Sequence, residues 1–154
     1  MKRALVLSFS PIASDPRVMR QVQALQGRYA LTVAGFGAAP AGELEFVALE
    51  PEAPSRTGKL VKAATLLGGL NEFHYWRMPL VQRTLAALQG RRFDVVVTND
   101  IIALPVALKL ANGTPVLLDA HEYAPREFED LWRWRVFLQR FYTHLCRRYL
   151  PRVA

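Results

Sequence analysis

The chain has 154 residues, of which 51% are hydrophobic and 21% charged, and its formal net charge is +7. This composition indicates one globular domain with one core and excludes a disordered chain. No apolar run is long enough to span a bilayer, and a single cysteine, Cys146, excludes an internal disulfide, so we expect a cytoplasmic protein. The basic balance favours phosphorylated ligands, anionic lipid or nucleic acid as partners.

Strands and helices are predicted to alternate from the first residues onward. Residues 3–9 are apolar without alternation, which is typical of a strand buried on both faces. Residues 14–28 are predicted to form a helix, because Ser14 or Asp15 can cap it and Pro16 suits its first turn. Two further strands are then predicted at residues 29–37 and 44–50.

The rest of the chain continues this alternation. The pattern from Lys59 to Gln89 is helical, with an expected interruption near Gly68 and Gly69 and a kink at Pro79. The remaining predicted elements are a strand at 93–100, a short helix at 101–113, a strand at 114–120 and a last long helix from 127 to about 149.

This order of elements predicts an α/β domain over residues 1–154. Alternating strands and helices imply a parallel sheet with right-handed crossovers and helices on both faces. Ligands of such sheets bind beyond the carboxyl ends of the strands. The segments at those ends are residues 8–15, 35–37, 98–100 and 119–122.

Several motifs that would define a cofactor are absent from the sequence. No G-x-G-x-x-G follows the first strand and no acid ends the second, which argues against NAD or FAD. The segment PSRTGKL departs from a P-loop, because leucine stands where magnesium needs Ser or Thr. HEYAP fits the zinc signature H-E-x-x-H only in part, since Pro125 replaces the second histidine. We therefore predict no metal and no cofactor.

The end of the last predicted strand carries a dense group of polar residues. Asp119 ends the strand, and His121 and Glu122 follow it almost directly. An imidazole that a carboxylate holds keeps one tautomer and presents its other nitrogen outward. This arrangement suits acid–base chemistry or sugar binding. The alternatives are that the carboxylates cap the next helix or form a loop salt bridge, and that His121 is a structural histidine.

Other strand ends offer further candidates. Asp15, beside Ser14, is a good cap for the first helix, and a helix N-terminus is also an anion site. Arg17 lies in the first turn of that helix and either meets a phosphate or faces solvent. Asp100 either caps the helix that follows it or accepts a hydrogen bond from a ligand hydroxyl.

Three segments together resemble a known family. They are SDPRVMRQVQAL, YALTVAGFG and FDVVVTNDIIALPVALKLANGTPVLLDAHEYAPREF. Their order and spacing resemble the N-terminal domain of family-four glycosyltransferases with the GT-B fold. In that family a D-x-R-V helix follows the first strand, a strand ending in an acid precedes an A-L-P-like helix, and the next strand ends in D-x-H-E.

The resemblance implies that residues 1–154 are the acceptor-side, Rossmann-like half of a GT-B enzyme. The other half would hold a nucleotide-sugar donor, so this half alone is expected to be inactive. The reaction would be retaining transfer, without a metal, to a glycan or lipid-linked acceptor such as a cell-envelope polysaccharide. Catalytic roles fall to His121, which would reach the donor sugar, and to Asp119. The implied substrate-binding residues are Ser14, Asp15, Arg17, Asp100 and Glu122.

Two other functions stay open at this point. One is a sugar-nucleotide 2-epimerase-like enzyme half, which shares the GT-B architecture. The other is a non-catalytic module that binds a phosphorylated ligand or nucleic acid, as the charge of +7 allows. No known nucleic-acid motif is visible, so nucleic acid is not a predicted partner.

The last helix has two predicted faces. Its apolar face is expected to comprise Leu131, Trp134, Leu138, Phe141 and Leu145. Its opposite face is expected to carry a basic ridge of Arg133, Arg140 and Arg147, flanked by Trp132 and Val136, which have no evident reason to be buried. The ridge is either a solvated back or a peripheral contact with anionic lipid at the inner face of the membrane.

Overall fold

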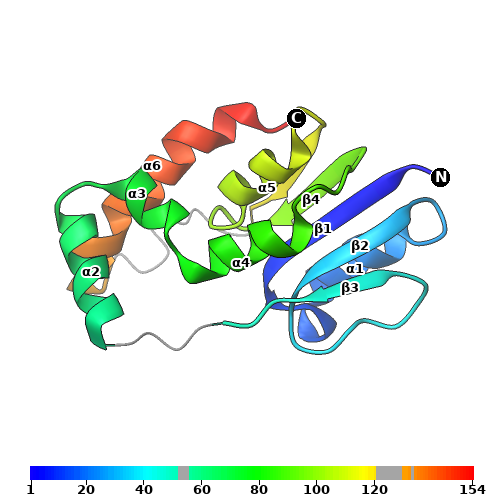
Figure 1. The fold of residues 1–154 in the computed structure, drawn as a ribbon, viewed down its shortest axis with the longest axis horizontal. Coiled ribbons are helices and arrows are strands. Elements are labelled where there is room, and N and C mark those ends of the chain that lie inside the picture. The colour runs from blue at the N-terminus through cyan, green and yellow to red at the C-terminus, as the bar shows by residue number, and fades with distance from the viewer. Residues whose placement is uncertain (52–55, 121–129, 133) are drawn as a thin grey trace.

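The chain forms one five-stranded parallel sheet with helices on both faces (Figure 1). The computed structural model describes residues 1–51, 56–120, 130–132 and 134–154. In spatial order the strands run β3-β2-β1-β4-β5, so β1 is central and the strand order reverses at β1. The predicted α/β, Rossmann-like parallel sheet is therefore confirmed.

The observed elements are close to the predicted ones. The strands are β1 (Arg3–Pro11), β2 (Ala30–Phe36), β3 (Glu45–Ala48), β4 (Val95–Asn99) and β5 (Val116–Asp119). The α-helices are α1 (Pro16–Leu25), α2 (Arg56–Leu67), α3 (Asn71–Trp76), α4 (Pro79–Leu88), α5 (Leu104–Ala111) and α6 (Gln139–Tyr149). A π-helical segment, Trp134–Leu138, leads into α6.

Side chains of the strands alternate between two buried cores, one on each face of the sheet, whereas the composition predicted a single core. Val6 and Val33 point to the face that α1 covers. Leu5 and Leu7 point to the opposite face, which α4, α5 and α6 cover. A side chain of this size contributes about 1.5–3 kcal/mol when it is fully buried. Because β1 buries both of its faces, its sequence is apolar without alternation.

The first helix begins two residues later than predicted. Asp15, not Ser14, caps it: Oδ1 of Asp15 accepts hydrogen bonds from the backbone N–H groups of Arg17, at 3.0 Å, and Val18, at 3.4 Å. Ser14 ends a 3₁₀ turn, Ile12–Ser14, and donates its hydroxyl to the carbonyl of Pro11. The cap stabilises the helix by about 1 kcal/mol.

The predicted helical stretch 59–89 is divided into α2, α3 and α4. Gly69 adopts a positive φ of 69° in the turn after α2, a conformation that glycine adopts without strain. A kink was predicted at Pro79. In the structure Pro79 is instead the first residue of α4. A first-turn residue needs no backbone N–H for the helix, so proline is well suited there.

The last helix differs from its predicted single run. Phe141 and Leu145 are buried and Trp132 and Val136 are exposed, as predicted, but Leu131 is 59% exposed. Leu131 is not part of a helix in the structure, so the helical spacing on which its predicted burial rested does not extend to it. The predicted start at 127 and Arg133 lie outside the described residues.

A partly buried carboxylate, that of Glu72, links α6 to α3. Glu72 accepts hydrogen bonds from the Tyr149 hydroxyl, at 2.8 Å, and from Trp76 Nε1, at 3.0 Å. Its other oxygen lies 2.7 Å from His144 Nε2 and 3.3 Å from Arg148 Nε. Partial burial alone would raise the pKa of Glu72, but these hydrogen bonds and the charge of Arg148 outweigh it and hold the pKa below its ordinary value.

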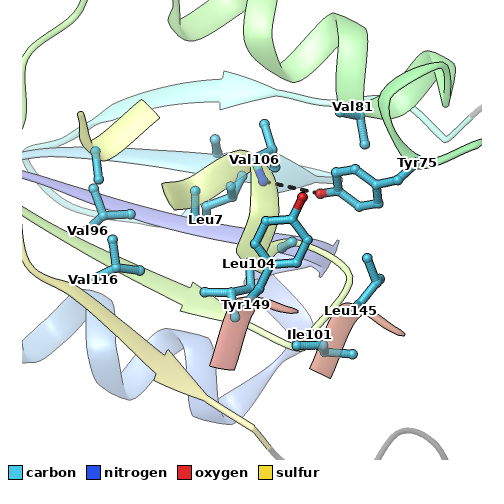
Figure 2. Close-up of a cluster of buried hydrophobic side chains, with 14 of the residues drawn as sticks. Leu7, Tyr75, Val81, Val96, Ile101, Leu104, Val106, Val116, Leu145 and Tyr149 are labelled. Carbon is cyan, nitrogen blue, oxygen red and sulfur yellow. Dashed lines mark hydrogen bonds between the residues drawn. The ribbon is translucent and has the colours of Figure 1, made fainter. Parts of the chain in front are cut away.

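Tyr75 of α3 fastens the start of α5 from inside the core (Figure 2). Its hydroxyl donates to the carbonyl of Ile102, at 2.8 Å, and accepts from the N–H of Val106, at 3.2 Å. Ala103, at the N-cap of α5, supplies no side-chain acceptor, so Tyr75 satisfies a first-turn donor. Burial raises the pKa of Tyr75, which keeps its hydroxyl protonated.

We expect Tyr75→Phe to lower the free energy of unfolding by about 1–3 kcal/mol, because it leaves two backbone groups unsatisfied in the core. Urea denaturation measures the loss. Tyr29→Phe is the control, since the Tyr29 hydroxyl makes no hydrogen bond within the part of the chain that the structure describes. Equal losses in the two variants would contradict the capping role.

Candidate functional site

The candidate site lies at the carboxyl ends of β1, β4 and β5, on the face of the sheet that α1 covers. The register of the parallel strands pairs Asn99, at the end of β4, directly with Asp119, at the end of β5. The first turn of α1 lies beside the end of β1. The strand order reverses at β1, and this is where sheets of this type bind their ligands.

Gln21 of α1 joins the ends of the two strands. Its Nε2 donates to Asn99 Oδ1, at 3.0 Å, and to Asp119 Oδ2, at 2.7 Å. The Asn99 amide donates back to Gln21 Oε1, at 2.9 Å. Asn99 is 1% exposed, and Asp119 is partly exposed. The paired amides thus hold one oxygen of Asp119 in place, while its Oδ1 accepts no hydrogen bond from any described residue.

A second cluster surrounds the start of α1. The hydroxyls of Ser8 and Ser10 lie 2.8 Å apart, and Ser10 donates to Asp15 Oδ2, at 3.2 Å. Asp15 Oδ1 caps α1 and lies 3.7 Å from Arg17 Nε. Both carboxylate oxygens of Asp15 therefore accept hydrogen bonds within the domain, and the role that the structure shows for Asp15 is to cap α1.

Arg17 has a buried donor that no described residue satisfies. Its Nη1 is inaccessible to solvent and lacks a hydrogen-bond acceptor within residues 1–51, 56–120, 130–132 and 134–154. A buried N–H without a partner costs free energy, so an acceptor brought by a ligand would be favoured there. Arg17 and Gln21 are four residues apart, and hence they share one face of α1.

Asp100 serves the turn between β4 and α5. It adopts a left-handed backbone with φ of 65°, which aspartate tolerates better than most residues. Its N–H donates to the carbonyl of Asp119 at 3.3 Å, and its carbonyl accepts from Ala103 N–H at 3.2 Å. The helix α5 begins at Leu104 without a side-chain cap, which argues against the alternative in which Asp100 caps it, and the predicted contact of Asp100 with a ligand stays a prediction.

The structure brings together some of the predicted residues. Asp119 lies in the Gln21 cluster, and Asp15 and Arg17 lie in the neighbouring one. Ser14 is exposed and bonded to Pro11, and it joins neither cluster. His121 and Glu122 lie outside the described residues, so their predicted roles stay predictions.

Four residues of these two clusters were not predicted from the sequence as site residues: Gln21, Asn99, Ser8 and Ser10. Gln21 follows Val18 by three residues and Arg17 by four, a spacing that would have placed it beside the sheet. For Asn99, the signal was its position as the last residue of an apolar strand. Within the described residues, no group of three or more His, Cys, Asp or Glu side chains could hold a metal ion.

No protein-family model, curated protein sequence or solved structure gives a significant match to this chain.

We expect Gln21→Glu to lower the free energy of unfolding by about 1–3 kcal/mol at neutral pH, because it removes the donor to Asp119 and places two carboxylates together. Repulsion raises the pKa of the introduced carboxyl in the folded state above its unfolded value. The stability deficit therefore grows as the pH rises through that pKa and shrinks in acid, where the protonated group can donate.

Chemical denaturation of Gln21→Glu between about pH 4 and pH 8 tests this expectation. Gln23→Glu is the matched control, since Gln23 is exposed on the same helix. A deficit for Gln21→Glu that does not change with pH would rule out the contact with Asp119.

Proposed function

We propose that this chain is the acceptor-side half of a retaining glycosyltransferase, which moves a sugar from a nucleotide-sugar to a glycan or lipid-linked acceptor. The observation that carries the proposal is the cluster of Gln21, Asn99 and Asp119 at the ends of two adjacent parallel strands. It coincides with the segments that resemble family-four enzymes.

The chemistry of this cluster suits a polyhydroxylated ligand. Sugar hydroxyls donate to carboxylates, and Asp119 Oδ1 is such an acceptor, held in orientation through Oδ2. Because Gln21 and Asn99 fix Asp119 before a ligand arrives, less side-chain entropy is lost on binding. A preorganised carboxylate is also what orients a reactive hydroxyl or an imidazole.

Arg17 supports an anionic group near this cluster. Its buried Nη1 would donate to a phosphate oxygen of a donor or of a phosphorylated acceptor. The same observation favours the second candidate function, a non-catalytic module that binds a phosphorylated ligand. The two candidates differ in whether the Asp119 carboxylate is needed for binding.

His121 enters the proposal as the group that reaches the donor sugar, with Asp119 and Glu122 orienting its imidazole. Positive side chains and helix N-termini would stabilise the departing pyrophosphate. A second, nucleotide-sugar-binding domain would complete the cleft, because transfer needs donor and acceptor fixed together.

We expect the chain to bind a saccharide or nucleotide-sugar with resonance shifts at the side-chain amides of Gln21 and Asn99. Two-dimensional NMR titration with a panel of nucleotide-sugars, glycans and inorganic phosphate measures this binding. Asp119→Asn should weaken it by about 10- to 100-fold, because a charge-assisted hydrogen bond is lost. Asp94→Asn is the control, since Asp94 lies at the amino end of the sheet and accepts from Arg3 N–H.

The outcomes separate the candidates. Phosphate binding that needs Arg17 but is insensitive to Asp119→Asn would favour the phospho-ligand module. Saccharide binding that Asp119→Asn leaves unchanged would contradict the proposed transferase site.

In the enzyme that contains this chain, we expect His121→Ala to lower kcat by about a hundredfold or more, because a positioned polar contact in the transition state is lost. Turnover assays with thermal melts measure both effects. A lower melting temperature with normal activity per folded molecule would make His121 a structural histidine instead.

A further inference from the structure

Exposed apolar side chains gather at one end of the molecule. Eight of the eleven large hydrophobic side chains found exposed in the described chain lie within residues 60–73 and 131–136. Helix α2 and the segment that leads into α6 lie side by side there, away from the sheet (Figure 1). Such a concentration on a small domain indicates a surface that meets a partner.

Helix α2 turns an apolar stripe toward solvent. Leu60, Ala64 and Leu67 are spaced by four and three residues and are all exposed, with Leu60 at 71% and Leu67 at 59%. Leu66, on another side of the helix, is buried in the core. The helix is therefore apolar both toward the core and away from it, which packing within the domain does not require.

Two depressions join this stripe to a row of arginines. The first has a volume of about 460 Å³ and is lined by Leu67, Trp132, Arg135, Val136, Gln139 and Arg140. The second, of about 520 Å³, shares Gln139 and Arg140 with it and continues along α6 to Arg147. Among the described residues, no carboxylate lines either depression.

We propose that this surface, made of Leu60, Leu67, Trp132, Val136, Arg135 and Arg140, rests on an anionic lipid bilayer. Apolar side chains and an exposed tryptophan suit the boundary between head groups and acyl chains, and arginine suits lipid phosphates. The contact is peripheral, since no helix among the described residues is long and apolar enough to cross a membrane. It stands independently of the proposed transferase site, which lies at the carboxyl ends of the strands.

Charge decides between a bilayer and a second copy of the chain. A two-fold interface through this surface would bring the arginines of the two copies toward one another, and each copy carries a net charge of +7. Anionic lipid removes that repulsion. Each arginine near such a membrane strengthens binding by about fivefold, so the row gives reversible adhesion that weakens with salt.

The test is sedimentation of the full chain with two kinds of vesicle, phosphatidylcholine alone and phosphatidylcholine with phosphatidylglycerol, at low and high salt. We expect binding to the anionic vesicles at low salt, weaker binding at high salt and little binding to the neutral ones. Arg135→Glu/Arg140→Glu should weaken binding by about 25-fold or more, from two lost contacts. Trp132→Ala should weaken it while leaving its salt dependence unchanged.

The control variant is Arg20→Glu/Arg28→Glu. It lowers the net charge by the same four units but changes exposed arginines on α1 and in the loop after it, whereas α6 covers the opposite face of the sheet. Circular dichroism verifies that each variant is folded. Equal weakening by the two double variants would reduce the effect to overall charge and overturn the proposal.

Three other results would also overturn the proposal. The first is no binding to anionic vesicles at low salt. The second is equal binding to neutral vesicles. The third is a dimer in solution that Arg135→Glu/Arg140→Glu dissociates, since that would make the surface an interface between copies.

Discussion

The sheet and the cluster at its strand ends both depend on β1, a strand that is buried on both faces and paired on both edges. Its register with β2 and β4 fixes where those strands end, because the ladders leave no freedom to slip once both faces are buried. The β4–β5 ladder then sets Asn99 beside Asp119. Helix α1 packs across the same face through Val18 and Val22, which delivers Gln21 to that pair.

The side-chain amide of Gln21 suits the centre of this cluster because it both donates and accepts hydrogen bonds. Gln21 donates to both Asn99 and Asp119 and accepts from Asn99, so the buried amide of Asn99 is satisfied without a charge being buried. Asp119 Oδ1 lies at the edge of the cluster and accepts no hydrogen bond from the residues that the structure describes. The functional proposal therefore rests on a carboxylate that is held in orientation at the ends of the strands.

The two proposed surfaces lie on different parts of the fold and use different physics. The strand-end site is polar, partly buried and preorganised by hydrogen bonds. The surface of α2 and the π-helical segment is apolar and basic, and it is held in place indirectly, since Glu72 anchors α6 to α3. A sugar transfer to a lipid-linked acceptor would use both surfaces. The two proposals are independent, so an experiment that refutes one leaves the other standing.

The sequence by itself determined the α/β class, the parallel sheet, the strand ends and the presence there of Asp15, Asp100 and Asp119. These follow from local periodicity and from the residues that begin and end elements. Only the tertiary structure decided that Gln21 meets Asn99, a residue 78 positions away, and that Tyr75 caps α5. It also decided that Leu131 is exposed, because Leu131 is not part of a helix and the periodicity on which its predicted burial depended does not extend to it. Periodicity records which side of an element is buried, whereas partners that lie far apart in the chain are chosen by packing.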